Sequence, residues 1–229
     1  MLNRLLAVMW LSFSLACAHD LWIEKFQDKY ILYYGHKYSS HSGKKLIKYN
    51  PENIQSVKCI DKNGNKIKIN VKKEYPLIIN ENCAIIYVDI SSGYWTKKPY
   101  GTINKPKSQV NTPIKSWLSY ESVKRINLWS KNLEKSFSKK LDIIPVNDPL
   151  KLQEGDKIRL LITFNGKPVK NIPVAYDGKY RGSTDNYGRI NIKIKHKGLQ
   201  LIEATYREKV YSEKTDEIIY TTILNFEVK

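Results

Sequence analysis

KIRLLITFNGKPVKNIPVAY, residues 157–176, holds two candidate strands and the tight turn that joins them. In residues 157–164, polar and apolar residues alternate with the period of a strand that buries one face. Residues 165–168 (NGKP) are typical of a tight turn, because glycine and proline suit the backbone angles that turns require. The apolar run 172–176 follows as the second strand, so this stretch predicts β-structure.

Short runs of the same kind continue on both sides of this stretch, with turn signals at intervals of roughly 8–12 residues. They are residues 141–146, 189–195, 200–206 and 218–228. Short strands without alternating helices are typical of a β-sandwich and argue against a parallel α/β fold. We therefore predict an immunoglobulin-like β-sandwich over residues 141–229.

The first half of the chain also has the pattern of β-strands. Residues 29–34 (KYILYY) are aromatic and β-branched, and residues 83–90 are apolar enough for a central strand. Asn63-Gly64 separates two further runs and supports the positive φ angles of a hairpin turn. The expected fold is all-β with two β-sandwich lobes, residues 19–140 and residues 141–229.

Two segments of the first lobe have a weaker pattern. Residues 99–113 are rich in proline, asparagine, lysine and glycine, which predicts a long loop. Residues 115–131 fit either an amphipathic helix or an extended strand around residues 122–128, and periodicity alone does not decide between them.

Residues 1–18 have the three parts of a secretory signal peptide: a basic start, an apolar run and the small-residue cleavage site Ala16-Cys17-Ala18. The apolar run is shorter than the roughly 20 residues that span a bilayer. Lipidation at Cys17 is the alternative, but Ser14 stands where lipoprotein signals usually carry an aliphatic residue. We therefore expect a soluble mature protein, secreted to the periplasm and beginning at His19.

The chain is strongly basic, with 39 Lys and Arg residues, 22 Asp and Glu residues and a formal charge of +17. The basic residues are mostly lysines spread along the sequence, and neither an arginine-rich motif nor a basic helix is present. This distribution argues against nucleic acid as the main partner. It leaves open a general attraction to anionic partners or lipid headgroups.

Two cysteines, Cys59 and Cys83, follow the predicted signal peptide. An even pair in an exported chain most simply forms a disulfide. The alternative is a thiolate metal site, which an oxidising compartment disfavours and for which no CxxC spacing is present.

Three of the 4 histidines, His19, His36 and His41, fall in the first quarter of the sequence. A histidine at a mature N-terminus offers its α-amine and its ring Nδ1 to one metal ion. A strand that starts at His19 and pairs antiparallel with residues 29–34 would bring His19 toward His36. The terminal amine, His19, His36 and His41 therefore form a candidate nitrogen site for a transition metal.

The neighbouring residues allow simpler explanations. Asp20 could orient an imidazole as a carboxylate behind the ligands, or it could be an exposed charge. Trp22 alternates with Asp20 and is expected in the core, and His196 lies between lysines in an expected exposed turn. Nitrogen ligands suit both nickel (Ni2+) and copper (Cu2+), so ligand type does not fix the metal. No GxSxG, HExxH or P-loop pattern is present, and we predict that the protein is not an enzyme.

Several motifs together resemble a known family. They are His19-Asp20-Leu21-Trp22, Tyr34-Gly35-His36, LDIIPVNDP (141–149), EGD (154–156), FNGKP (164–168) and TDNYG (184–188). This combination resembles the periplasmic nickel-transport accessory family, exported β-sandwich proteins long described as a domain of unknown function. Its members are associated with nickel uptake by energy-coupling ABC transporters. The resemblance covers most of the mature chain, but residues 91–140 match poorly.

The resemblance implies that His19 and His36 bind metal, whereas His41 is added from its proximity and matches no motif. It implies a periplasmic protein that binds nickel and assists an inner-membrane ABC-type uptake transporter. Two other functions remain open: a copper-binding histidine-brace protein or enzyme, and an envelope interaction module in which the histidines bind no metal.

Overall fold

A computed structural model describes residues 19–38 and 45–229 of the chain. Their regular structure consists of β-strands and four single-turn 3-10 helices, which confirms the all-β prediction. The helices are η1 (Pro51–Asn53), η2 (Lys107–Gln109), η3 (Lys131–Leu133) and η4 (Pro149–Lys151). The strands are β1 (Asp20–Phe26), β2 (Lys29–Gly35), β3 (Ile54–Ile60), β4 (Lys66–Ile67), β5 (Ile78–Ile79), β6 (Ile85–Lys98), β7 (Gly101–Ile103), β8 (Lys115–Ile126), β9 (Asp142–Pro145), β10 (Lys157–Phe164), β11 (Lys167–Pro168), β12 (Pro173–Tyr176), β13 (Lys179–Ser183), β14 (Arg189–Lys193), β15 (Gly198–Lys209) and β16 (Glu217–Val228).

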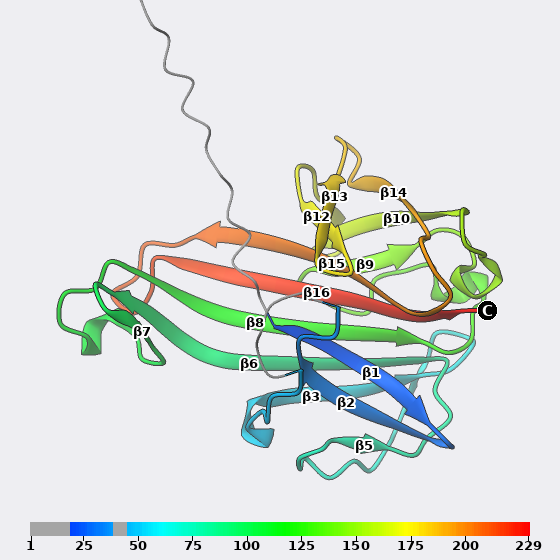
Figure 1. The fold of residues 1–229 in the computed structure, drawn as a ribbon, viewed down its shortest axis with the longest axis horizontal. Coiled ribbons are helices and arrows are strands. Elements are labelled where there is room, and N and C mark those ends of the chain that lie inside the picture. The colour runs from blue at the N-terminus through cyan, green and yellow to red at the C-terminus, as the bar shows by residue number, and fades with distance from the viewer. Residues whose placement is uncertain (1–18, 39–44) are drawn as a thin grey trace, which may run out of the picture.

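The strands form three sheets, and the largest lies between the other two (Figure 1). The 9-stranded central sheet has the order β13-β12-β15-β16-β8-β6-β3-β4, with β7 paired to β6. A 4-stranded sheet, β11-β10-β14 with β9 on β10, covers one face. The 3-stranded sheet β1-β2-β5 covers the opposite face. This layering confirms a β-sandwich architecture.

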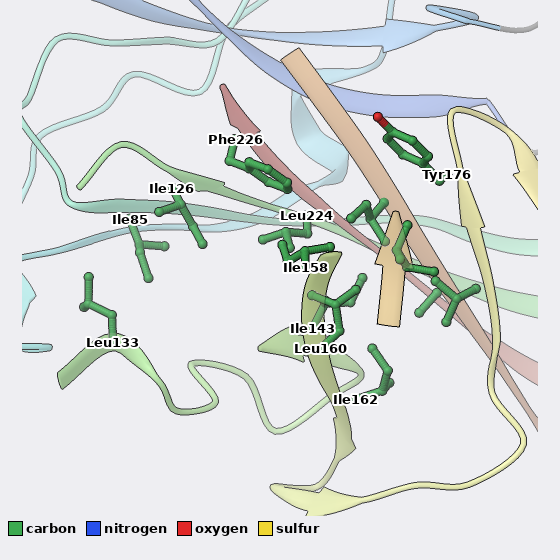
Figure 2. Close-up of a cluster of buried hydrophobic side chains, with 14 of the residues drawn as sticks. Ile85, Ile126, Leu133, Ile143, Ile158, Leu160, Ile162, Tyr176, Leu224 and Phe226 are labelled. Carbon is green, nitrogen blue, oxygen red and sulfur yellow. The ribbon is translucent and has the colours of Figure 1, made fainter. Parts of the chain in front are cut away.

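Each face of the central sheet has its own hydrophobic core. Along β16, Leu224 and Phe226 belong to the core shared with β9 and β10, whereas Ile223 belongs to the core beneath β1 and β2. Successive side chains of a strand point to opposite faces, so one strand serves both cores. In Figure 2, Ile143 of β9 and Leu160 of β10 gather with Leu224 in the first of these cores.

The central sheet joins the two halves of the chain through β8 and β16. These strands pair in parallel, with Glu121 opposite Thr221 and Val123 opposite Ile223. Because β8 precedes residue 140 and β16 follows it, the sheet is continuous across the expected lobe boundary. The division of the chain into two lobes at residue 140 stays a prediction.

The structure settles the uncertain segments of the first lobe. Residues 115–126 form strand β8, because both of its edges are hydrogen-bonded, to β6 on one side and β16 on the other. The expected loop 99–113 contains the short strand β7 and the single turn η2. The hairpin at Asn63-Gly64 is confirmed: Cys59 lies opposite Ile67, and Gly64 has φ +82°.

Cys59 and Cys83 form the expected disulfide, with their Cα atoms 5.2 Å apart. Both residues are buried in the core beneath β1 and β2. Because disulfides persist in oxidising compartments, this bond is typical of an exported protein. In the described part of the chain, the structure shows no helix with the length and apolar character needed to cross a membrane.

A buried ion pair connects the central sheet to the 4-stranded sheet. Nζ of Lys124 on β8 lies 2.5 Å from Oδ1 of Asp142 on β9, and the two side chains are only 2% and 0% exposed. The same Nζ donates to the carbonyl oxygen of Ile143, and the second Asp142 oxygen accepts from the backbone N–H of Phe137. Each charge is therefore held by several partners in the interior.

Candidate functional site

The β1–β2 hairpin brings His19 and His36 together. Asp20 lies opposite Gly35, so the next position outward places His19 across from His36. The two imidazole ring centroids are 4.7 Å apart, at an interplanar angle of 46°. The expected antiparallel pairing of a strand starting near His19 with residues 29–34 is therefore present.

Gly35 determines where His36 lies. A Cβ atom at this position would come within 2.2 Å of the carbonyl oxygen of Lys45, so a larger residue does not fit. The close approach allows the backbone N–H of His36 to donate to that oxygen at 3.0 Å. His36 is thus held between β2 and the backbone of Lys45.

The free edge of β1 is fixed by two side chains from the central sheet. The N–H of Ile23 donates to Oδ1 of Asn225 on β16, and Arg125 of β8 donates to the carbonyl oxygen of Ile23. These bonds satisfy backbone groups that an edge strand would otherwise leave unpaired. The hairpin that carries the two histidines is therefore anchored on the middle strands of the sheet.

The Nδ1 atom of each histidine of the pair lies against the protein. Nδ1 of His36 is buried and has no hydrogen-bond partner among the described residues. Nδ1 of His19 lies 3.2 Å from the hydroxyl of Tyr34. Burial, and then the charge of His36, lower the pKa of His19. The neutral imidazole is the form that binds a metal, so a lowered pKa favours ligation at neutral pH.

Asp20 shapes the segment after His36. Its Oδ2 accepts from the backbone N–H of Lys37 at 3.0 Å. Burial raises the pKa of Asp20, against the opposing effect of that hydrogen bond. Asp20 thus stabilises the chain beside an imidazole, while a direct role in orienting the ring stays a prediction.

Two further carboxylates lie on the covered face of the central sheet and were missed from the sequence. Glu121 lies two residues before Val123 on β8, and Glu203 lies two residues after Leu201 on β15. Residues two apart in a strand point to the same face, and Val123 and Leu201 belong to the core beneath β1 and β2. Burial raises the pKa of Glu121 to about 7. Burial, together with the charges of Asp20 and Glu121, raises the pKa of Glu203 to about 7.

The charges of these carboxylates act on residues that contact or neighbour the histidine pair. Burial and the charge of Glu121 raise the pKa of Tyr34, whose hydroxyl contacts His19. The charge of Asp20 likewise contributes to the raised pKa of Glu203. The only sequence signal for these carboxylates is that each glutamate stands next to aromatic, apolar or small residues, Glu203 within the predicted strand 200–206 and Glu121 within the ambiguous segment 115–131.

The remaining histidines differ from this pair. His41 lies outside the described residues. His196, expected in an exposed turn, places its Nε2 2.8 Å from Oδ2 of Asp177, and its ring is 5.7 Å from that of Tyr38. Within residues 19–38 and 45–229, no three His, Cys, Asp or Glu side chains are close enough together to hold a metal ion. The histidine pair therefore needs a further donor, such as the terminal amine of a processed chain.

The two glutamates predict a characteristic pH dependence of stability. Each has a pKa of about 7 in the folded protein against an ordinary value of 4.5. Below pH 4.5 both states are protonated, and between pH 4.5 and 7 the unfolded state loses its protons first. The free energy of unfolding of the metal-free protein should therefore fall across this interval and level off above pH 7.

Urea denaturation at a series of pH values measures this effect. A pKa unit corresponds to about 1.4 kcal/mol, so the loss is at most ~3.5 kcal/mol per group and smaller where water reaches the side chain. The double variant Glu121→Gln/Glu203→Gln should show a flatter profile, whereas Glu213→Gln, at an exposed position, should keep the original one. An unchanged slope in the double variant contradicts the assignment.

Comparison with known proteins places the chain in a family without assigning an activity. No curated protein and no solved structure matches it. A family model matches residues 16–208, a range that includes His19, His36, Glu121 and Glu203. Because the match covers most of the chain, the protein belongs to the family described as "Domain of unknown function (DUF4198)".

Proposed function

We propose that this protein is an exported carrier of a transition metal ion, nickel (Ni2+), which it binds as cargo through His19 and His36. The observation that carries the proposal is the histidine pair itself. The ring centroids are 4.7 Å apart, and the buried Nδ1 of His36 has no partner among the described residues. An unpartnered buried nitrogen is costly unless a ligand satisfies it, and imidazole nitrogen is a preferred donor for nickel.

The proposal requires signal-peptide cleavage after Ala18, which would free the α-amine of His19. Residues 1–18 lie outside the described residues, so cleavage is part of the proposal. The amine and Nδ1 of His19 would then form a chelate with the ion, and His36 would add a third nitrogen. In the structure, Nδ1 of His19 lies 3.2 Å from the hydroxyl of Tyr34. Metal binding would replace this contact.

The nearby carboxylates support cation binding in a chain with a formal charge of +17. Glu121 and Glu203, each with a pKa of about 7, would lose their protons when a cation arrives, because its positive charge lowers their pKa. Metal uptake would thus release protons, and acidification would favour metal release. In the periplasm, such a carrier would pass the ion to an inner-membrane ABC-type nickel uptake transporter.

Native mass spectrometry of protein purified from the periplasm tests this function. We expect a chain that begins at His19 and retains one nickel ion after one equivalent is added. The variant His36→Ala should lose the ion, whereas His196→Ala should keep it because His196 pairs with Asp177. Parallel samples with copper test Cu2+, which the same donors suit.

Two results would contradict the proposal. A mature chain that starts at another residue lacks the terminal chelate, and a chain that starts at His19 but retains no metal lacks the site. Either result would favour an envelope interaction module. If the protein retained copper but not nickel, copper would be the bound metal instead of nickel. An assay of peroxide-dependent copper chemistry would then test for a copper enzyme.

A further inference from the structure

One end of the central sheet projects beyond the two outer sheets. Strands β6, β8, β15 and β16 extend past the strands that cover their faces, toward the left end of Figure 1. Their connections meet there: the N–H of Lys107 donates to the carbonyl oxygen of Lys214, and Lys107 Nζ lies 2.5 Å from Asp216 Oδ1. We call residues 97–115 and 209–217 the tip.

The tip carries the two most exposed large apolar side chains of the described residues. Tyr211 is 107% exposed and Tyr100 is 98% exposed, so both rings stand clear of the surface. Ile114, at 59%, adds an exposed aliphatic side chain to the same end. The backbone that bears them is ordered by hydrogen bonds, since Val210 donates to Asp216 and Ile114 donates to Lys97.

The tip is also basic. Residues 97–115 contain five lysines and no acidic residue, and residues 209–217 add two lysines and three acids. Two of these acids are already paired, Asp216 with Lys107 and Glu217 with both Lys115 and Arg207. A shallow hollow lies between the loops and is lined in part by Lys107, Lys209 and Tyr211. The charge that remains for a partner is therefore positive.

We propose that the tip is a docking surface for the anionic headgroup layer of a phospholipid membrane. Tyrosine is enriched at membrane interfaces, because its ring enters the headgroup region while its hydroxyl stays hydrated. Lysines beside such a surface are attracted by anionic lipids. Two isolated, projecting rings on a basic tip match a soft, negatively charged layer, whereas a protein partner would need a preformed pocket for each ring. This inference does not depend on metal binding.

Co-sedimentation with lipid vesicles tests the proposal on the full mature protein. We expect binding to vesicles that contain phosphatidylglycerol, no binding to vesicles of phosphatidylcholine alone, and loss of binding at high salt. The variant Tyr100→Ser/Tyr211→Ser should weaken binding about tenfold, because it removes both interfacial rings. Its matched control is Tyr180→Ser/Tyr187→Ser, which changes two exposed tyrosines outside the tip and should bind normally.

A charge variant separates electrostatic attraction from ring insertion. Each lysine near an anionic surface strengthens binding by a factor of about five, so Lys97→Gln/Lys105→Gln/Lys209→Gln should weaken it about 100-fold. The control Lys167→Gln/Lys170→Gln/Lys193→Gln removes the same charge elsewhere and should have a much smaller effect. Equal losses in both triple variants would show general charge attraction and overturn the assignment to the tip. Failure to bind any vesicle would also overturn the proposal and would favour an acidic protein as the partner of the tip.

Discussion

Extension of the mature chain by four glycines before His19, which keeps the new terminal amine away from the imidazole, is expected to weaken nickel binding by on the order of 100-fold or more. The extension converts the α-amine of His19 into an amide, which removes the second donor of the proposed chelate and leaves the imidazole in place. Two donors on one residue bind as a linked pair, so the loss of one also removes the gain from linkage. Isothermal titration calorimetry of mature protein with a defined N-terminus, at pH 7.5, measures the change.

Two variants make this result specific. His36→Ala should also reduce nickel affinity, because His36 supplies the buried, unpartnered nitrogen. His196→Ala should leave the affinity unchanged. If the glycine-extended protein bound nickel as tightly as the mature protein, the terminal amine would not be a ligand, even if both imidazoles were.

The substitution Lys124→Met is expected to lower the free energy of unfolding by about 3–5 kcal/mol. It leaves the carboxylate of Asp142 charged in the interior, where the side chain has 0% exposure. Lys58→Met provides a matched control, because Lys58 pairs with Asp89 and lies over the same Tyr87 ring, but is 23% exposed. A more exposed pair contributes less, so we expect a loss of about 1 kcal/mol or less for this control.

Urea denaturation of the three proteins measures both effects. The double variant Lys124→Met/Asp142→Asn should recover much of the loss, since it removes both charges and keeps an oxygen that accepts from the N–H of Phe137. Equal losses of unfolding free energy for Lys124→Met and Lys58→Met would show that the greater burial of the Lys124–Asp142 pair does not increase its contribution to stability.

Local signals predicted those parts of the fold that short-range physics determines. The turn Asn63-Gly64, the Cys59–Cys83 disulfide and the β1–β2 pairing each depend on residues close in sequence or on one covalent bond. Strand β8 was ambiguous because it serves a core on each face. Its residues Trp117, Tyr120 and Val123 fit a helical stripe, and only the pairing with β6 and β16 selects the strand.

In the candidate site, too, only the residues positioned by local structure could be predicted from the sequence. His19 and His36 could be placed from the register of a single hairpin. Glu121 and Glu203 could not, because they reach the site through the central sheet, in which parallel β8 and β16 come from distant parts of the chain. No periodicity in a single segment indicates which distant strands will be neighbours.

The place of β16 in the sheet has a consequence for the order in which the protein folds during export. A chain that crosses a membrane from its N-terminus presents β8 long before β16, the last strand in sequence, arrives beside it. During that interval the edge of β8 is open to other chains, and contacts between distant segments form slowly. Because β1 is held by Asn225 of β16, the histidine hairpin gains its final support at the same moment. Under the proposed function, metal loading would therefore follow the completion of translocation.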